Sequence, residues 1–270
     1  MNTLARYPER IVCLTEETTE TLYLLGEERR IVGISGYTVR PPQARREKPK
    51  VSAFLSAKTD KILQLKPDLV IGFSDLQADI ARELAKAGLN VVLFNQRSVE
   101  EILNTILVLS SIVGASDKGI ELVEQLERGL AQIRADGKKF SRKPNVYFEE
   151  WDEPMISGIR WVSELVGIAG GEDVFSELSL SHAASGRVIA DPRAVVEKRP
   201  DVILGSWCGK KFRPERVAAR PGWDAVPAVR DGELHEIKSS EILQPGPAAL
   251  TDGVRRIHAI LADWARRRSP

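Results

Sequence analysis

The sequence predicts an α/β protein of two similar lobes, joined by a long rigid interlobe helix and enclosing a ligand cleft. The main observation is an internal repeat, since Lys66–Gly72 (KPDLVIG) returns as Arg199–Gly205 (RPDVILG). In each copy a short amphipathic run leads through Pro-Asp into an apolar run closed by glycine, a pattern typical of a helix, a tight turn and a buried parallel strand. We therefore expect an N-terminal lobe at 1–97, an interlobe segment at 98–140 and a C-terminal lobe at 141–270.

The similarity extends outward from the two copies. The apolar strand at 10–14 runs into the polar loop 15–18, and the strand at 145–148 runs into the polar segment 149–152. A helical stretch ending in glycine follows each of them, and a further strand follows each Pro-Asp copy, at 90–94 and 233–237.

A different pattern separates the halves. Apolar residues recur at helical spacing from Val99 to Val113, Gly114 interrupts them, and Ser116 restarts a run that continues beyond Ile133. At about 1.5 Å per residue the second piece is roughly 30 Å long, which is enough to cross from one lobe to the other. We expect a stiff helix that allows only small closure of the lobes.

Composition excludes several classes of protein. The chain has 270 residues, 43% of them hydrophobic and 29% charged, and a net charge of +1, so neither nucleic acid nor a membrane is an expected partner. No run of about 18 apolar residues occurs, and the two cysteines, Cys13 and Cys208, provide no disulfide framework. Read as written, the first ten residues lack a secretory signal, which indicates a cytoplasmic monomer, or a periplasmic one if a leader has been removed.

The candidate site lies where the strands end, because ligands of parallel α/β lobes bind outside the carboxyl ends of the strands. On the first lobe these ends carry two carboxylates and three aromatic side chains, and on the second lobe a mixed set. The candidates of the first lobe are Glu16, Glu17, Tyr37, Phe54 and Phe73, and those of the second lobe are Glu150, Trp151, His182, Trp207 and Glu241.

The order of these motifs resembles the cobalamin-binding solute-receptor family, of the helical-backbone class that also holds siderophore and haem receptors of ABC importers. The similarity runs from the TEETTE stretch through GISGY…PP, KPDLVIG and the interlobe helix to GGEDVF and RPDVILG. It implies non-catalytic, non-covalent binding of a corrinoid, with Tyr37, Phe54 and Phe73 against the ring. The family's tryptophan near 179–184 is not matched, and His182 stands there, so Trp151 and Trp207 would supply apolar surface.

Two departures from the family pattern bear on partners and ligand. Where importer receptors present one acidic residue on each lobe to the permease, this chain has Asp60 and Arg193, and the reversed charge opposes docking. This favours a carrier or sensor over a receptor that works with a transporter. The predicted cleft is also more acidic than a neutral corrinoid requires, through Glu16, Glu17, Glu149, Glu150, Asp152 and Glu241.

Other functions stay open at this level. The acidic residues also fit a siderophore, haem or smaller cationic ligand, or a carboxylate-dependent hydrolase, although no nucleophile–base pair or phosphate-binding loop accompanies them. The three histidines are scattered, which argues against a protein-held metal; His182 or Cys208 could instead be an axial ligand to the cobalt of a corrinoid. We expect a binding protein rather than an enzyme.

Overall fold

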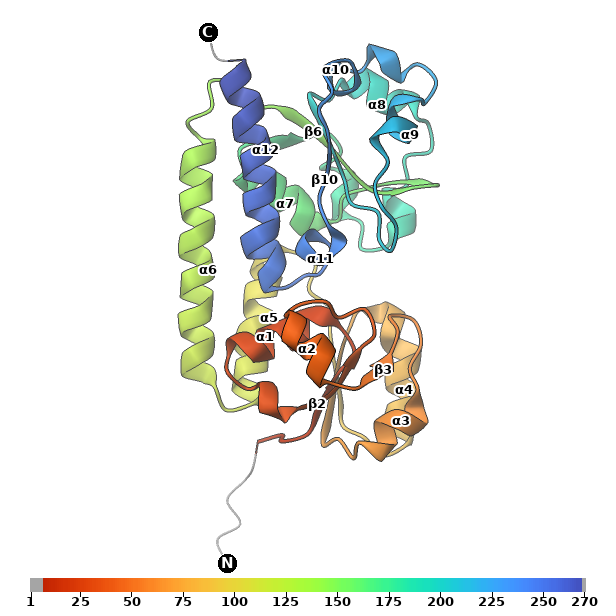
Figure 1. Cartoon of the computed structure of the whole chain (residues 1–270), viewed down its shortest axis with the longest axis vertical. Coiled ribbons are helices and arrows are strands. Elements are labelled where there is room, and N and C mark those ends of the chain that lie inside the picture. Colours follow the sequence, from red (N-terminus) through yellow and green to blue (C-terminus); the bar gives the residue numbers. More distant parts are fainter. Residues whose placement is uncertain (1–6, 269–270) are drawn as a thin grey trace, which may run out of the picture. The chain divides into compact units, whose positions relative to one another are not determined.

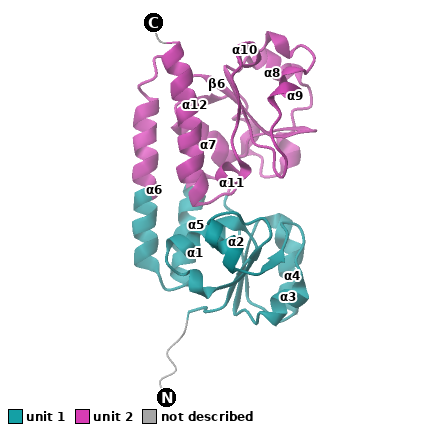
Figure 2. Cartoon of the chain, in the orientation of Figure 1, with its two compact units in different colours: residues 1–96, 100–125 teal, residues 97–99, 126–270 magenta. Residues whose placement is uncertain are grey.

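The computed structural model describes residues 7–268 (Figure 1). Two compact units divide the chain (Figure 2): unit 1 holds residues 7–96 and 100–125, and unit 2 holds residues 97–99 and 126–268. No helix within the described residues has both the length and the apolar character that crossing a membrane requires.

Unit 1 is built on a parallel sheet, as the sequence predicts. Its strands are β1 (Ile11–Cys13), β2 (Ile31–Ser35), β3 (Lys50–Ser52), β4 (Leu69–Phe73) and β5 (Val91–Phe94). They lie in the order β3-β2-β1-β4-β5, and every neighbouring pair is parallel. All carboxyl ends therefore meet at one edge of the sheet.

Helices cover both faces of this sheet (Figure 1). They are α1 (Glu16–Leu24), α2 (Pro42–Glu47), α3 (Thr59–Gln64), α4 (Ala78–Lys86) and α5 (Val99–Ile112). Alternate side chains of each strand point to opposite faces, so Ile11 and Cys13 pack with α1 and α5 residues such as Leu22 and Leu109. On the other face Val12 packs with residues of α3 and α4. Such two-sided burial explains why the strands are continuously apolar.

The predicted connecting helix is α6 (Ser116–Gly137), which is continuous although Gly119 and Gly129 lie inside it. Its residues up to Gln125 belong to unit 1 and those from Leu126 to unit 2. Gly119 lets α5 approach closely, because a Cβ there would lie 2.0 Å from Ser110 Oγ.

Unit 2 has a mixed sheet of β6 (Asn145–Asp152), β7 (Met155–Ser157), β8 (Glu172–Asp173), β9 (Val202–Gly205) and β10 (Leu234–Glu236). The order is β10-β9-β6-β7, with β8 also paired to β6. Its helices are α7 (Arg160–Ile168), α8 (Arg193–Lys198), α9 (Pro214–Ala218), α10 (Pro227–Arg230), α11 (Ser239–Ile242) and α12 (Val254–Arg267). In Figure 1, α7 and α12 lie on one face of this sheet, and α8, α9 and α10 on the other.

The two sheets are less alike than the repeat suggests. Strand β7 pairs antiparallel with β6, with Asp152 opposite Met155, so the segment after the Glu153-Pro154 turn is a hairpin strand rather than a lead into the next helix. The polar loop predicted at 15–18 is also wrong, because α1 begins at Glu16. Acidic and hydroxyl side chains are common in the first turn of a helix, where they interact favourably with backbone N–H groups that have no partner within the helix. The polar stretch is therefore the start of the helix and not a loop before it.

The Pro-Asp repeat forms the same turn twice. Lys66 and Arg199, which precede the prolines, have φ angles of 46° and 48°. The following aspartates both tie down the start of the first strand of their unit: Asp68 accepts from the Arg10 N–H at 3.0 Å, and Asp201 from the Asn145 N–H at 2.9 Å. Sequence similarity here reflects one local structure used in both units.

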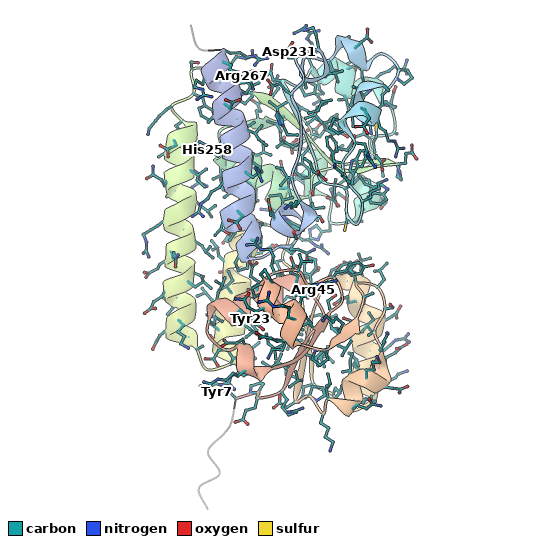
Figure 3. All side chains as sticks on the ribbon, viewed as in Figure 1. Tyr7, Tyr23, Arg45, Asp231, His258 and Arg267 are labelled. Carbon is teal, nitrogen blue, oxygen red and sulfur yellow. The ribbon has the colours of Figure 1, made fainter. Side chains whose placement is uncertain are left out.

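Helix α12 is bonded to the rest of unit 2 at two places along its length. His258 Nδ1 lies 3.0 Å from the Ala169 carbonyl oxygen, and near the C-terminus Arg267 Nη1 lies 2.8 Å from the buried Glu233 carboxylate. Both residues are labelled in Figure 3, with Asp231, which pairs with Arg268 at 2.7 Å.

Candidate ligand-binding site

The first turn of α1 places two carboxylates at the carboxyl edge of the unit 1 sheet, and both are buried. Glu16 Oε2 accepts hydrogen bonds from the backbone N–H groups of Val39 and, at 3.3 Å, Arg40. Glu17 accepts from the Thr15 hydroxyl at 2.5 Å. Burial raises the pKa of each carboxyl from 4.5 to about 7, against the lowering effect of these hydrogen bonds. The two carboxyls are therefore partly protonated near neutrality.

The three aromatic candidates of unit 1 differ in exposure. Tyr37, in the loop after β2, is 65% exposed, whereas Phe54 is half-buried. Phe73 is only 6% exposed, because it is the last residue of β4 and pairs in register with Phe94. Its backbone N–H also donates to Gln77 Oε1 at 3.0 Å, which fixes the strand end.

Other apolar residues near these candidates are more exposed than Phe54 and Phe73. Val39, Leu55 and Leu76 are 41%, 68% and 60% exposed. They follow β2, β3 and β4, as Tyr37 follows β2, and the ends of these parallel strands lie at one edge. We call Tyr37, Val39, Leu55 and Leu76 the apolar rim. Large apolar side chains exposed together are typical of an interaction site.

The unit 2 carboxylates are largely offset by basic side chains of the same unit, which corrects the expectation of an unbalanced acidic surface. Glu149 is fully buried and pairs with Arg220 through two hydrogen bonds of 2.5 and 2.9 Å. Glu150 and Arg187 form a second two-bond pair, at 2.6 and 3.1 Å.

Asp152 forms a third pair, with Lys210. Burial raises the pKa of the Asp152 carboxyl, but the contacts with Lys210 and Arg216 lower it further than burial raises it. The unpaired negative charge that Glu149, Glu150 and Asp152 give to unit 2 is therefore much smaller than the sequence suggests.

The two tryptophan candidates have separate roles in the structure. Trp207 is 3% exposed, donates its indole N–H to Glu149 at 3.0 Å and packs edge-on against Phe212, so it is part of the core. Trp151 is half-buried, and the ammonium of Lys210 lies 4.0 Å from its ring centroid. One face of Trp151 is thus covered by a cation of the same chain.

The remaining candidates lie on short segments. His182 is exposed between two 3₁₀ turns of unit 2, and its neighbour Leu180 is 67% exposed. Glu241 is half-buried in α11. Across residues 7–268, no three histidine, cysteine or acidic side chains are grouped in a way that could hold a metal ion.

The two residues predicted to meet a permease are both exposed. Asp60 lies in the first turn of α3. Arg193 begins α8 and pairs with Asp191 through contacts of 2.6 to 3.1 Å, which hold the pKa of the Asp191 carboxyl below its ordinary value. The charge of Arg193 is thus balanced locally.

Known proteins share this fold and sequence pattern. An uncharacterized ABC transporter substrate-binding lipoprotein, YvrC of Bacillus subtilis, is 26% identical over 94% of this chain and 80% of its own length. A vitamin B12-binding protein of Vibrio parahaemolyticus is also 26% identical, over 92% of this chain and 88% of its own. The periplasmic heme-binding protein RhuT from Roseiflexus sp. RS-1, 23% identical, superposes with a TM-score of 0.76 over 94% of this chain and 99% of its own.

The family model described as "Periplasmic binding protein" matches residues 11–241, a span that runs from β1 of unit 1 to α11 of unit 2. That span includes both copies of the Pro-Asp repeat and the whole apolar rim. The chain therefore belongs to the periplasmic binding protein family.

Proposed function

We propose that this chain is a solute receptor for a corrinoid or a similar flat, tetrapyrrole-sized ligand. The observation that carries the proposal is the apolar rim, where Tyr37, Leu55 and Leu76 are each at least 60% exposed at the carboxyl edge of unit 1. A macrocycle with large apolar faces could bury these side chains, and each fully buried one contributes about 1.5–3 kcal/mol. Members of this family bind solutes without chemistry, so the chain is not an enzyme.

The names of the relatives agree with a ligand of this size, since one is a vitamin B12-binding protein and another a periplasmic heme-binding protein. We propose that the candidate residues given above contact the ligand, and that the boundaries 1–97, 98–140 and 141–270 divide the chain functionally. Val39, Leu55 and Leu76 are added to the contact set. Phe73 and Trp207 would support the contact residues from beneath, because both are buried.

A siderophore is an alternative of similar size, and a smaller cationic ligand is less well supported. The acidic candidates of unit 2 would have to attract that cation, yet Glu149, Glu150 and Asp152 are each paired with a basic side chain. An apolar rim gives a small, strongly hydrated cation no compensation for its lost water.

The test is a titration of the purified protein with cyanocobalamin, haemin and a ferric hydroxamate, read by tryptophan quenching and calorimetry. We expect a micromolar or tighter dissociation constant for one macrocycle, and a loss of about 10- to 100-fold in Tyr37→Ala if the ring is fully buried in the complex. Leu24→Ser is the matched control, because Leu24 is 53% exposed in unit 1 but ends α1, away from the rim. Absence of binding by both macrocycles at about 100 μM, roughly 5 kcal/mol of affinity, would overturn the proposal.

The partner and the compartment depend on each other. The local balance of Arg193 by Asp191 supports the view that unit 2 does not present the acidic residue that a permease would contact there. A receptor without a permease fits the cytoplasmic carrier or sensor role, and a receptor with one must work outside the membrane, as YvrC, a lipoprotein, would. Cell fractionation in the source organism, with antibody detection, separates the two.

A further inference from the structure

The loop that carries Tyr37 is held from two sides. It joins β2 to α2, and on one side Glu16 Oε2 accepts the backbone N–H groups of Val39 and Arg40. The Arg40 guanidinium in addition pairs with Glu20 at 3.0 Å. All of these contacts come from a single face of α1.

On the other side the loop is held by α2. Arg45, labelled in Figure 3, donates from Nη1 to the carbonyl oxygens of Gly36 at 2.8 Å and Thr38 at 3.1 Å. Tyr37 lies between these two anchored residues, and its side chain projects to solvent. The loop is thus held by Glu16 and Glu20 of α1, by Arg45 of α2, and by the Gly36 N–H, which donates to the Ser52 carbonyl oxygen at 2.7 Å.

We propose that Glu16 is a positioning residue for Tyr37: its carboxylate fixes the β2–α2 loop, and loss of its negative charge, by substitution or by protonation, loosens that loop. The consequence for ligand affinity rests on the proposed function, in which Tyr37 contacts the ligand. The consequence for the loop does not. A charged acceptor forms hydrogen bonds about twice as strong as a neutral one, so the same contacts hold less tightly after protonation.

The surroundings of Glu16 make this change accessible near neutral pH. Burial is the main cause that raises the pKa of Glu16 to about 7, the neighbouring Glu20 raises it further, and Arg40 and the two backbone N–H groups oppose them. Glu17 in the same turn repels Glu16 in the same way.

This geometry separates positioning from simple stability. Glu16→Gln removes a buried charge and its repulsion from Glu17 and Glu20, so the variant should unfold at a higher urea concentration than the native protein above pH 7. The same substitution should nevertheless loosen the Tyr37 loop. Substitution of a residue with only a structural role would change the stability to urea and the order of the Tyr37 loop in the same direction.

The first experiment measures hydrogen exchange of the Val39 and Arg40 amides by NMR between pH 5.5 and 8, corrected for the intrinsic rate. In the native protein we expect protection to fall severalfold or more as the pH drops through about 7. Glu16→Gln should show low, pH-independent protection. Glu17→Gln, which removes a buried carboxylate without a bond to the loop, should keep the full change but at a lower pH, because its repulsion is gone.

The second experiment measures the dissociation constants for cyanocobalamin and haemin at pH 8 and pH 6. For the ligand that binds, the affinity of the native protein should be severalfold weaker at pH 6 than at pH 8. The Glu16→Gln variant should bind weakly at both pH values. If the native protein binds neither, the proposed function fails while the exchange data still decide the role of Glu16. Equal protection of Val39 and Arg40 in native protein and Glu16→Ala, at every pH, would overturn the positioning role.

Discussion

The contact between the end of α6 and the rest of unit 2 makes a sharp prediction about two glycines in one helix. A Cβ atom on Gly137 would lie 2.8 Å from the Gly170 Cα and 2.9 Å from its nitrogen, and a Cβ on Gly129 would meet nothing within 4 Å. Backbone atoms cannot rotate away as a side chain can. Gly170 is itself constrained, with a φ of +101° and the Phe140 ring 2.6 Å from its own would-be Cβ.

The two alanine substitutions should therefore have opposite signs. Gly129→Ala should stabilise the protein by about 0.5–1 kcal/mol through helix propensity. Gly137→Ala gains less, because it stands at the helix end, and overpacking of this kind destabilises by about 1–3 kcal/mol. The variants should thus differ by roughly 1.5–4 kcal/mol, or about 3–16 °C in melting temperature at roughly 2–4 °C per kcal/mol.

Urea and thermal unfolding followed by tryptophan fluorescence is the appropriate assay, because all 5 tryptophans lie in unit 2. Circular dichroism at 222 nm, followed in parallel, reports both units. A Gly137→Ala protein as stable as Gly129→Ala would refute the close approach of α6 to the Gly170 turn.

Two further predictions concern charge. Arg220→Met should destabilise unit 2 by about 3–5 kcal/mol in urea unfolding, because it leaves the fully buried Glu149 without its cation, whereas Arg193→Met, at an exposed pair, should change nothing measurable. Similar losses in both variants would contradict the burial of Glu149. The raised pKa values of Glu16 and Glu17 mean that the folded chain binds protons that the unfolded chain lacks, so the free energy of unfolding should decrease from pH 4.5 to about 7. The decrease in the free energy of unfolding is at most about 3 kcal/mol per group, and the Glu17→Gln variant should show a smaller decrease. A free energy of unfolding that rises with pH in this range, and that is unchanged by Glu17→Gln, would be inconsistent with these pKa shifts.

Local pattern was sufficient for most of the fold. The repeat at Lys66–Gly72 and Arg199–Gly205 correctly predicted β4 and β9 with the helices α3 and α8 before them, because an apolar run after Pro-Asp leaves a buried strand as the natural outcome. The helical periodicity after Ser98 likewise predicted α5 and α6, with the break at Gly114. Strand β7 was missed because three residues carry too little alternation to be distinguished from a loop.

The candidate site was harder to predict, for a physical reason. The sequence does not show which side chains near a strand end turn toward the core: Phe54 is half-buried and Phe73 buried, whereas Leu55 and Leu76 are exposed. The partners of the acidic residues lie far along the chain: Arg187 is 37 positions from Glu150, and Arg220 is 71 from Glu149. No local pattern contains such pairs.

The twin Pro-Asp turns have a consequence for how the molecule can be rearranged. Asp68 and Asp201 each bond the backbone at the start of their own unit's first strand, and each belongs to a seven-residue stretch with the same left-handed residue before its proline. Each stretch thus holds the first strand of its own unit in place without a side chain of the other stretch. Exchanging KPDLVIG for RPDVILG between the halves should therefore yield a foldable hybrid, which makes these cassettes natural crossover points for recombining related receptors.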